Sequence, residues 1–188
     1  TAMDTATLDA LYFASTTSPY AEKQSATTIA WAANLRTDIF TVDCTDSLRA
    51  GTNALKLALD AAKAASAKRV AVVAADHRLA QPRSAFERTF GDGAATLVVG
   101  NDQLIASVDG HLSVSHEIMD VWRSADEDMV RSWEDRFRLE KGFIESLRES
   151  VSKALQKFGT TIKDYARVSV SAPDLRADRE AARSGRRT

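Results

Sequence analysis

Cysteine is almost absent from this sequence: Cys44 is the one cysteine among 188 residues. A single cysteine excludes a disulfide within the chain and fits a reducing compartment. No apolar run approaches the roughly 20 residues that a helix needs to cross a bilayer. The start, Thr1 to Thr7, has neither the charged region nor the apolar core of a secretion signal. We therefore expect a cytoplasmic protein with no membrane partner.

An excess of charge of one sign is also missing. The 25 Lys and Arg residues nearly balance the 26 Asp and Glu residues, for a formal net charge of -1. Binding to nucleic-acid phosphates would require a basic surplus. The basic end, from Arg176 to Arg187, contains Asp178 and Glu180 and is typical of a solvated helix or tail. We expect no nucleic-acid partner.

Recognisable metal and phosphate motifs are missing as well. The three histidines (His77, His111 and His116) have neither a paired cysteine nor a helical i,i+4 partner, so we expect no metal site. The segment Phe90 to Ala94 (FGDGA) lacks the lysine and serine of a phosphate loop and precedes a predicted strand, which favours a tight turn. Asp76 and His77 follow a predicted strand end, where α/β proteins place functional groups, but the start of a polar loop is the interpretation we favour.

Apolar runs and helical patterns alternate along the chain. Strands are predicted at 8–15, 38–43, 69–75, 94–100, 104–108, 111–121 and 167–171, and helices at 18–35, 47–66 and 135–158. The helix at 47–66 is apolar nearly all round and is expected to be buried, with Asp46 as its N-cap. This alternation predicts an α/β layered fold with a largely parallel sheet. The first strand begins near residue 1 and the last helix has barely started, so we expect a fragment or one half of something larger.

Four segments together resemble the 3-hydroxy-3-methylglutaryl-CoA (HMG-CoA) synthase and ketoacyl synthase III branch of the thiolase superfamily. Ala14 to Ala33 is similar to the strand, loop and helix before the nucleophile of these enzymes, and Val42 to Leu55 to the nucleophile elbow and the helix behind it. Ala85 to Asp102 resembles their Gly-Asp-Gly strand entry, and Asp120 to Arg123 (DVWR) their Asp-Phe-Trp-Arg segment. Order and spacing agree from about residue 8 to residue 176.

The resemblance implies a thiolase-like layered α-β-α-β-α fold made of two duplicated halves. Residues 1–108 would form the N-terminal half without its first strand, and residues 109–188 the start of the C-terminal half. Such proteins are generally dimers that pair through the strand at 38–43, so a homodimer or a partner subunit of the same fold is expected. Acyl-CoA thioesters would be the ligands, as substrates rather than as cofactors.

The nucleophile of the synthases is a cysteine at the start of the buried helix, where a helix N-terminus lowers a thiol pKa and donates backbone N–H groups. Five residues of this chain align with that elbow: Asp43, Thr45, Gly51, Thr52 and Leu55. This register places Leu48 at the cysteine position, and leucine has no nucleophile. Cys44 lies four residues earlier, at the strand end, where a lone cysteine is typically a small buried apolar residue.

The other catalytic positions of the family are also replaced. The general-base glutamate would fall at Thr16, in the turn after the first strand. The catalytic histidine would fall at Ser171, with Asp174 at the neighbouring asparagine position. We further expect substrate contacts from two turns: Asp46, Ser47, Gly91, Asp92 and Gly93.

Three functional hypotheses remain open. The first is a non-catalytic subunit, a pseudoenzyme that completes an acyl-CoA complex. The second is an enzyme of altered chemistry, such as a retro-aldol lyase on an acyl-CoA, which needs a base and an oxyanion site but no cysteine. The third is a condensing acyltransferase that uses Cys44.

Overall fold

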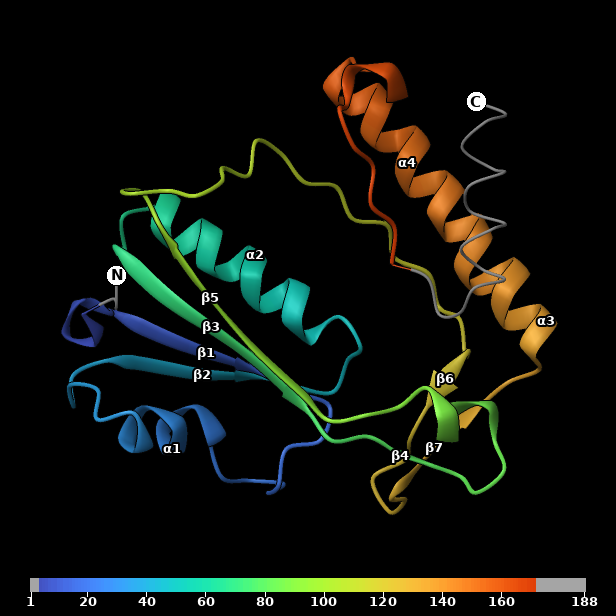
Figure 1. The fold of residues 1–188 in the computed structure, drawn as a ribbon, viewed down its shortest axis with the longest axis horizontal. Coiled ribbons are helices and arrows are strands. Elements are labelled where there is room, and N and C mark those ends of the chain that lie inside the picture. The colour runs from blue at the N-terminus through green and yellow to red at the C-terminus, as the bar shows by residue number, and fades with distance from the viewer. Residues whose placement is uncertain (1–3, 172–188) are drawn as a thin grey trace. The chain divides into compact units, whose positions relative to one another are not determined.

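The computed structural model describes residues 4–171 (Figure 1). The chain separates into two compact units, Thr1–Ala106 and Ser107–Thr188. The expected halves, 1–108 and 109–188, stay a prediction, because a compact unit need not be one copy of a duplicated fold.

The first unit is built on a four-stranded sheet. Its central strands are β1 (Ala10–Ala14) and β3 (Arg69–Asp76), with β2 (Phe40–Cys44) and β5 (Gly93–Gly100) at the edges. β1 is parallel to β2 and to β3, whereas β5 runs antiparallel to β3. The strands predicted at 8–15, 38–43, 69–75 and 94–100 are therefore confirmed, and three of the four are mutually parallel.

Two helices cover opposite faces of this sheet (Figure 1). α2 (Ala50–Lys63) packs on the face that carries Tyr12, Val70 and Val72. α1 (Ser25–Ala32) packs on the other face, against Leu11 and Phe13. Alternate side chains of a strand point to opposite faces, so all five residues of β1 are buried. The buried side chains of α2 are four alanines spaced four apart, which lets the helix lie close to the sheet: Ala50, Ala54, Ala58 and Ala62.

The helix predicted at 18–35 is shorter than expected. α1 begins at Ser25 because the Asp43 carboxylate accepts hydrogen bonds from the Ser25 N–H (2.7 Å) and the Ala26 N–H (2.7 Å). It ends before Asn34, which adopts a positive φ of 52°. The long-range cap from β2 thus replaces the local start signal at Pro19.

The helix predicted at 47–66 is also shorter, and its expected N-cap is wrong. α2 begins at Ala50, and Arg49 rather than Asp46 occupies the N-cap position. Asp46 has a φ of 63° and lies in the turn before the helix. Nor is α2 buried all round, because Leu57 is 49% exposed.

β5 is exposed along most of its length. Six of its eight residues are exposed, among them Leu97 and Val98. As the last strand of the sheet it pairs with β3, and no strand among residues 4–171 pairs with its other edge. An apolar strand with a free edge is a surface that folded proteins normally cover.

Short elements complete the first unit. Two are 3₁₀ turns, η1 (Thr5–Thr7) and η2 (Ala85–Arg88), and the third is the short strand β4 (Leu79–Ala80). The strand predicted at 104–108 is wrong: these residues are irregular and Ile105 is fully exposed. A strand needs a hydrogen-bonded neighbour, and within residues 4–171 none pairs with this segment.

The second unit combines a hairpin with a long helix. β6 (Val121–Trp122) and β7 (Met129–Ser132) are antiparallel. The helix comprises α3 (Asp135–Phe137), a π-helical stretch η3 (Arg138–Ile144) and α4 (Glu145–Phe158), so the helix predicted at 135–158 is confirmed. Gly159 ends it with a φ of 63°.

Two further strand predictions in this unit are wrong. Residues 111–120 are irregular, with strand structure only from Val121, and 167–171 is irregular after the 3₁₀ turn η4 (Ile162–Asp164). Both segments carry alternating patterns, but no neighbouring strand is described for either one. Among residues 4–171, no helix combines the length and the apolar character that crossing a membrane requires.

Candidate functional site

The carboxyl ends of β1 and β3 meet at one edge of the sheet, where Asp76 organises the turn that follows β1. Asp76 Oδ1 accepts hydrogen bonds from the Thr16 N–H (2.7 Å) and the Thr16 hydroxyl (3.0 Å). It also accepts from the hydroxyls of Ser15 (3.1 Å) and Thr17 (3.1 Å). A single carboxylate oxygen thus holds all three residues of the turn.

These hydrogen bonds determine the ionisation of Asp76. Burial by itself raises the pKa of a carboxyl group, but the bonds from the Thr16 N–H and from the three hydroxyls outweigh it, and the pKa of Asp76 lies below its ordinary value. Asp76 is therefore a charged acceptor at neutral pH and a poor proton acceptor. The hydroxyls that donate to it are committed to structure.

His77 follows Asp76 directly and pairs with Asp92. The His77 Nδ1 atom lies 2.5 Å from Asp92 Oδ1. The His77 N–H donates to the Thr17 hydroxyl at 2.9 Å, which connects the pair to the Asp76 turn. The β3–β5 register explains the meeting: Asp76 is opposite Gly93, so the next residue of one strand lies near the preceding residue of the other.

An open pocket of about 470 Å³ lies at this edge. We call it the carboxyl-end site. Its polar lining comes from Ser15, Thr17 and the titratable residues Asp76, His77 and Asp92. The rest of the lining is mainly apolar: Phe13, Pro19, Ala75, Gly93 and Ala94. Of the predicted substrate contacts, Asp92 and Gly93 lie here, and Thr16 lies directly behind the lining through Asp76.

The turn before α2 contains the other predicted residues. Leu48 is 56% exposed, two residues before the helix begins. The Ser47 hydroxyl accepts from the Arg49 N–H at 3.1 Å, and the Thr45 hydroxyl donates to Asp46 at 3.0 Å. These side chains stabilise the turn itself and do not line the carboxyl-end site.

Cys44 is the last residue of β2 and is partly buried against the core beneath α2. Burial, with a smaller contribution from the charge of Asp43, raises the pKa of the Cys44 thiol. A thiol of this kind is protonated at neutral pH and unreactive. Cys44 therefore has the environment of a structural cysteine.

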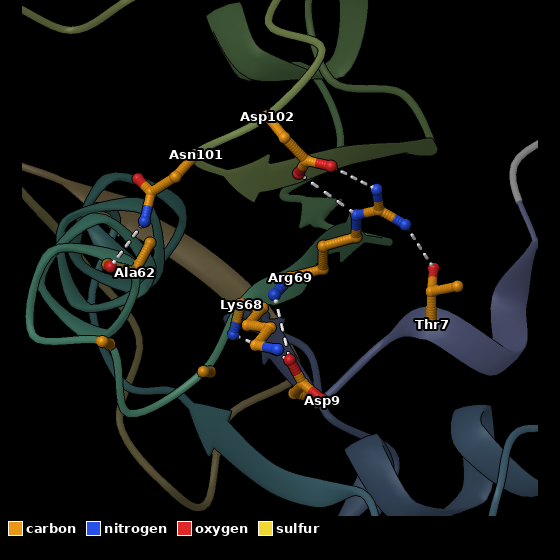
Figure 2. A pocket seen from close by; sticks show the side chains of 9 residues that line it. Thr7, Asp9, Ala62, Lys68, Arg69, Asn101 and Asp102 are labelled. Carbon is orange, nitrogen blue, oxygen red and sulfur yellow. Dashed lines mark hydrogen bonds and ion pairs between the residues drawn. The ribbon is translucent and has the colours of Figure 1, made fainter.

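The opposite end of the sheet has a second pocket, of about 360 Å³ (Figure 2). Arg69 binds Asp102 there (Nη2 to Oδ2, 2.6 Å) and donates to the Thr7 hydroxyl at 2.9 Å. Asp9 accepts from the backbone N–H groups of Lys68 (2.7 Å) and Arg69 (3.2 Å). We call these residues the amino-end cluster. Since Arg69 binds Asp102 and Asp9 binds the backbone, the cluster serves to hold strand ends together.

Among the residues of 4–171, no group of three or more His, Cys, Asp or Glu side chains is arranged to hold a metal ion. Ser171 is exposed and lies outside any helix or strand, in the second unit. Asp174 lies outside the described residues.

Comparison with known proteins agrees with this architecture. The chain is 27% identical over 176 residues to the hydroxymethylglutaryl-CoA synthase of Thermococcus onnurineus, which covers 93% of this chain and 50% of the relative. The chain is similar to the HMG-CoA synthases and 3-oxoacyl-(acyl-carrier-protein) synthases III of the thiolase superfamily. No family model matches the chain.

Solved thiolase-superfamily structures show the same fold. An HMG-CoA synthase complexed with CoA superposes with a TM-score of 0.80 at 21% identity, covering 88% of this chain and 42% of that one. A synthase III from Aquifex aeolicus gives a TM-score of 0.75 at 18% identity, covering 97% and 59%. The chain thus has the thiolase-like α/β fold and spans about half the length of the curated relatives it matches.

The thiolase-like fold brings together only part of what the sequence predicted. Thr16, Asp92 and Gly93 lie at or directly behind the carboxyl-end site, whereas Leu48 and Cys44 lie outside its lining. The family roles carried onto these residues stay predictions. His77, which was predicted to lie at the start of a polar loop, lines this site beside Asp92. The signal was an Asp-His pair at a strand end followed, 15 residues later, by an aspartate in a Gly-Asp-Gly turn.

Proposed function

We propose that this chain is part of a thiolase-fold protein that handles acyl-CoA thioesters without a cysteine nucleophile. It would be either a degenerate subunit or an enzyme of altered chemistry. The observation that carries the proposal is Leu48, which stands exposed in the turn before α2 and offers no nucleophilic atom. A leucine cannot form the acyl-enzyme on which condensation depends.

The choice of ligand rests on the relatives. A structural neighbour is an HMG-CoA synthase complexed with CoA, and another is a synthase in complex with 3-hydroxy-3-methylglutaryl coenzyme A. By analogy, CoA thioesters are the ligand class we propose for this chain.

Two alternatives differ in their support. A condensing acyltransferase that uses Cys44 is disfavoured, because burial raises the pKa of that thiol and Cys44 lies at a strand end. A cysteine-independent lyase is favoured by a specific observation, the exposed His77–Asp92 pair, because retro-aldol cleavage requires a group that exchanges protons but no nucleophile.

We also propose that the chain functions with a partner, either a second copy or a subunit of the same fold. The support is the apolar surface left open on the sheet and α2, with Leu57, Leu97 and Phe40 all about half exposed or more. β2 is the edge strand at which the family resemblance places the dimer contact. Its Phe40 N–H and Cys44 carbonyl bond to the β1 side, so the Thr41 N–H faces outward.

The nucleophile proposal is tested by intact-protein mass spectrometry after incubation with acetyl-CoA. The wild-type chain should gain no acetyl group, whereas Leu48→Cys should gain one, because it places a thiol beside the N-terminus of α2. Leu48→Cys combined with Cys44→Ala is the matched control and should gain the same adduct. Acetylation of the wild type that disappears in Cys44→Ala would establish Cys44 as a nucleophile and overturn the proposal. No adduct on either Leu48→Cys variant would contradict the register that places Leu48 at the family cysteine.

The partner proposal is tested by sedimentation of the purified chain. Thr41→Pro removes an outward N–H and should abolish pairing through β2, shifting a dimer to a monomer. Thr41→Ala is the control, because it removes the same side-chain hydrogen bonds to Gln24 and Thr27 but keeps the N–H. A chain that sediments as a monomer before any substitution would rule out the homodimer and leave the partner subunit to be sought by co-purification.

A further inference from the structure

The carboxyl-end site contains one imidazole, that of His77, with Asp92 beside it. We propose that His77 and Asp92 form an acid–base pair for the acyl group of an uncharged 3-hydroxyacyl thioester, with His77 as the proton-exchanging group and Asp92 as its positioning residue. The inference rests on the proposed function, since it names the residues and substrate class for a cysteine-independent reaction.

The geometry of the pair suits this role. Asp92 Oδ1 lies 2.5 Å from Nδ1, so a carboxylate there orients the ring and favours the tautomer with its proton on Nδ1. The side chains of His77 and Asp92 are 66% and 74% exposed, so the pair is open to a ligand. The His77 backbone is fixed in turn by its bond to the Thr17 hydroxyl. A histidine oriented by a carboxylate is the arrangement by which enzymes hold a general base in one tautomer.

Competing bases in the site are already engaged. Asp76 accepts four hydrogen bonds on one oxygen, and its lowered pKa makes it a weak base. The hydroxyls of Ser15 and Thr17 donate to Asp76 and have no base of their own. Histidine is also the side-chain type that exchanges protons near neutral pH. His77 is therefore the lining residue suited to move a proton.

The lining determines the class of acyl group. The carboxylates of Asp76 and Asp92 repel a negative charge on the ligand, which disfavours acyl chains that carry a carboxylate of their own. The apolar side chains of Phe13, Pro19 and Ala75 suit a short alkyl chain. A hydroxyl group on that chain would meet the open side of the imidazole. These features together point to an uncharged 3-hydroxyacyl group.

The proposed cleavage balances without any co-reactant. His77 Nε2 takes the proton of the C3 hydroxyl while the C2–C3 bond breaks. C3 becomes a carbonyl, and the electron pair of the broken bond passes to C2 as the thioester enolate. The imidazolium, stabilised by Asp92, then returns the proton to C2. The products are a shorter acyl thioester and an aldehyde or ketone, with no net oxidation.

Cleavage of 3-hydroxybutyryl-CoA to acetyl-CoA and acetaldehyde tests the reaction in the full chain. His77→Asn should lower kcat by about a hundredfold or more, the typical worth of a general base. Asp92→Asn should lower kcat less and leave KM unchanged, as expected of a residue that orients the base. His111→Asn is the matched control and should have no effect, because His111 is exposed in the second unit and only its backbone carbonyl accepts a described hydrogen bond. Cleavage that survives His77→Asn overturns the proposal.

If the chain alone shows no turnover, ligand binding to His77 tests the inference instead. The ring resonances of His77, assigned with His77→Asn, are followed by NMR while CoA, butyryl-CoA or 3-hydroxybutyryl-CoA is added. A change in these resonances with 3-hydroxybutyryl-CoA that butyryl-CoA and CoA do not produce supports the pair as the hydroxyl-binding group. Equal changes with all three, or changes elsewhere in the spectrum but not at His77, overturn this inference and leave the proposed function standing. No change anywhere with any of the three overturns both.

Discussion

The two ends of the same sheet are held by similar hydrogen-bond networks but differ in the charged side chains beside them. At each end an aspartate at a strand terminus accepts several hydrogen bonds. Asp9 accepts two backbone N–H groups at the amino end, and Asp76 accepts one N–H and three hydroxyls at the carboxyl end. At the amino end the neighbouring charges also bind one another, as Arg69 binds Asp102 and Arg36 binds Asp9. At the carboxyl end the neighbouring charge belongs to an exposed His77–Asp92 pair that lines a pocket.

The two ends therefore differ in what their side chains can do: those at one end join strands, and those at the other also include a group that can exchange protons. Interactions that only join strands leave no group able to exchange protons near neutral pH, and the amino-end cluster fits that description (Figure 2). The carboxyl-end site has the same kind of support and, in addition, a histidine oriented by a carboxylate. Parallel sheets place functional groups at this end because loops from neighbouring strands converge there. Substitutions at Asp76 and Asp9 test whether the two ends differ in this way.

The largest effect on stability is expected from Asp76→Ala. Removing the acceptor leaves the Thr16 N–H and three hydroxyls without their partner, and hydrogen bonds to a charged acceptor contribute roughly 1.5–3 kcal/mol each at most. We expect the free energy of unfolding to fall by about 2 kcal/mol, measured by urea denaturation. Asp92→Ala is the control: its side chain is 74% exposed, and a change of about 0.5 kcal/mol or less is expected. Equal losses for the two variants would contradict a structural role confined to Asp76.

A smaller loss is expected from Asp9→Asn at the amino end. Asp9 accepts two backbone N–H groups and binds Arg36, but its side chain is 34% exposed, so solvent weakens these interactions. We expect about 1 kcal/mol of destabilisation. Asp38→Asn is a matched control, because Asp38 binds the same arginine from a side chain that is 74% exposed. An equal effect of both substitutions would mean that only the ion pair to Arg36 contributes.

The smallest effect concerns pH. The pKa of Asp76 in the folded protein lies below its ordinary value, despite burial that acts to raise it, because hydrogen bonds stabilise the carboxylate. A group with a depressed folded pKa contributes stability that is fully present above its unfolded pKa, near 4, and is lost as the pH falls through its folded pKa. The stability difference between the wild type and Asp76→Asn should therefore be constant from pH 7 to about pH 5 and shrink below about pH 4. Urea denaturation across this range measures it, and a difference that grows at low pH would contradict the direction of the shift.

The core of the first unit could be predicted from the sequence because its apolar segments are also the segments that the fold buries. The apolar runs of β1 and β3 need two covered faces, and the structure provides them with α1 and α2. By contrast, the start of α1 depends on Asp43, a residue 18 positions away that no local signal reveals. The segments 104–108 and 167–171 fail for a related reason: the first is largely apolar and the second alternates, as strands do, but a strand exists only with a neighbour.

The candidate site was readable only in part. Asp92 and Gly93 were predicted from their resemblance to a family turn. His77 was interpreted as part of a polar loop start, and its partner Asp92 lies 15 residues away in the sequence. The β3–β5 register brings His77 and Asp92 together. A register depends on how two strands pair, so it cannot be predicted from the sequence of either strand alone. Asp46 shows the opposite error, since a good helix cap in sequence lies in a turn with a φ of 63°.

Because β5 pairs with a strand on one side, hydrogen exchange of its amides can follow the pairing of its other edge over time. Alternate amides of an edge strand point away from their one neighbour, and such amides exchange their hydrogens with water quickly. In β5 these amides occur within a run of exposed residues from Gly93 to Val98. When another strand covers that edge, their exchange slows while the amides facing β3 change little. The exchange rates of β5 thus report directly on whether a further strand pairs with its outer edge.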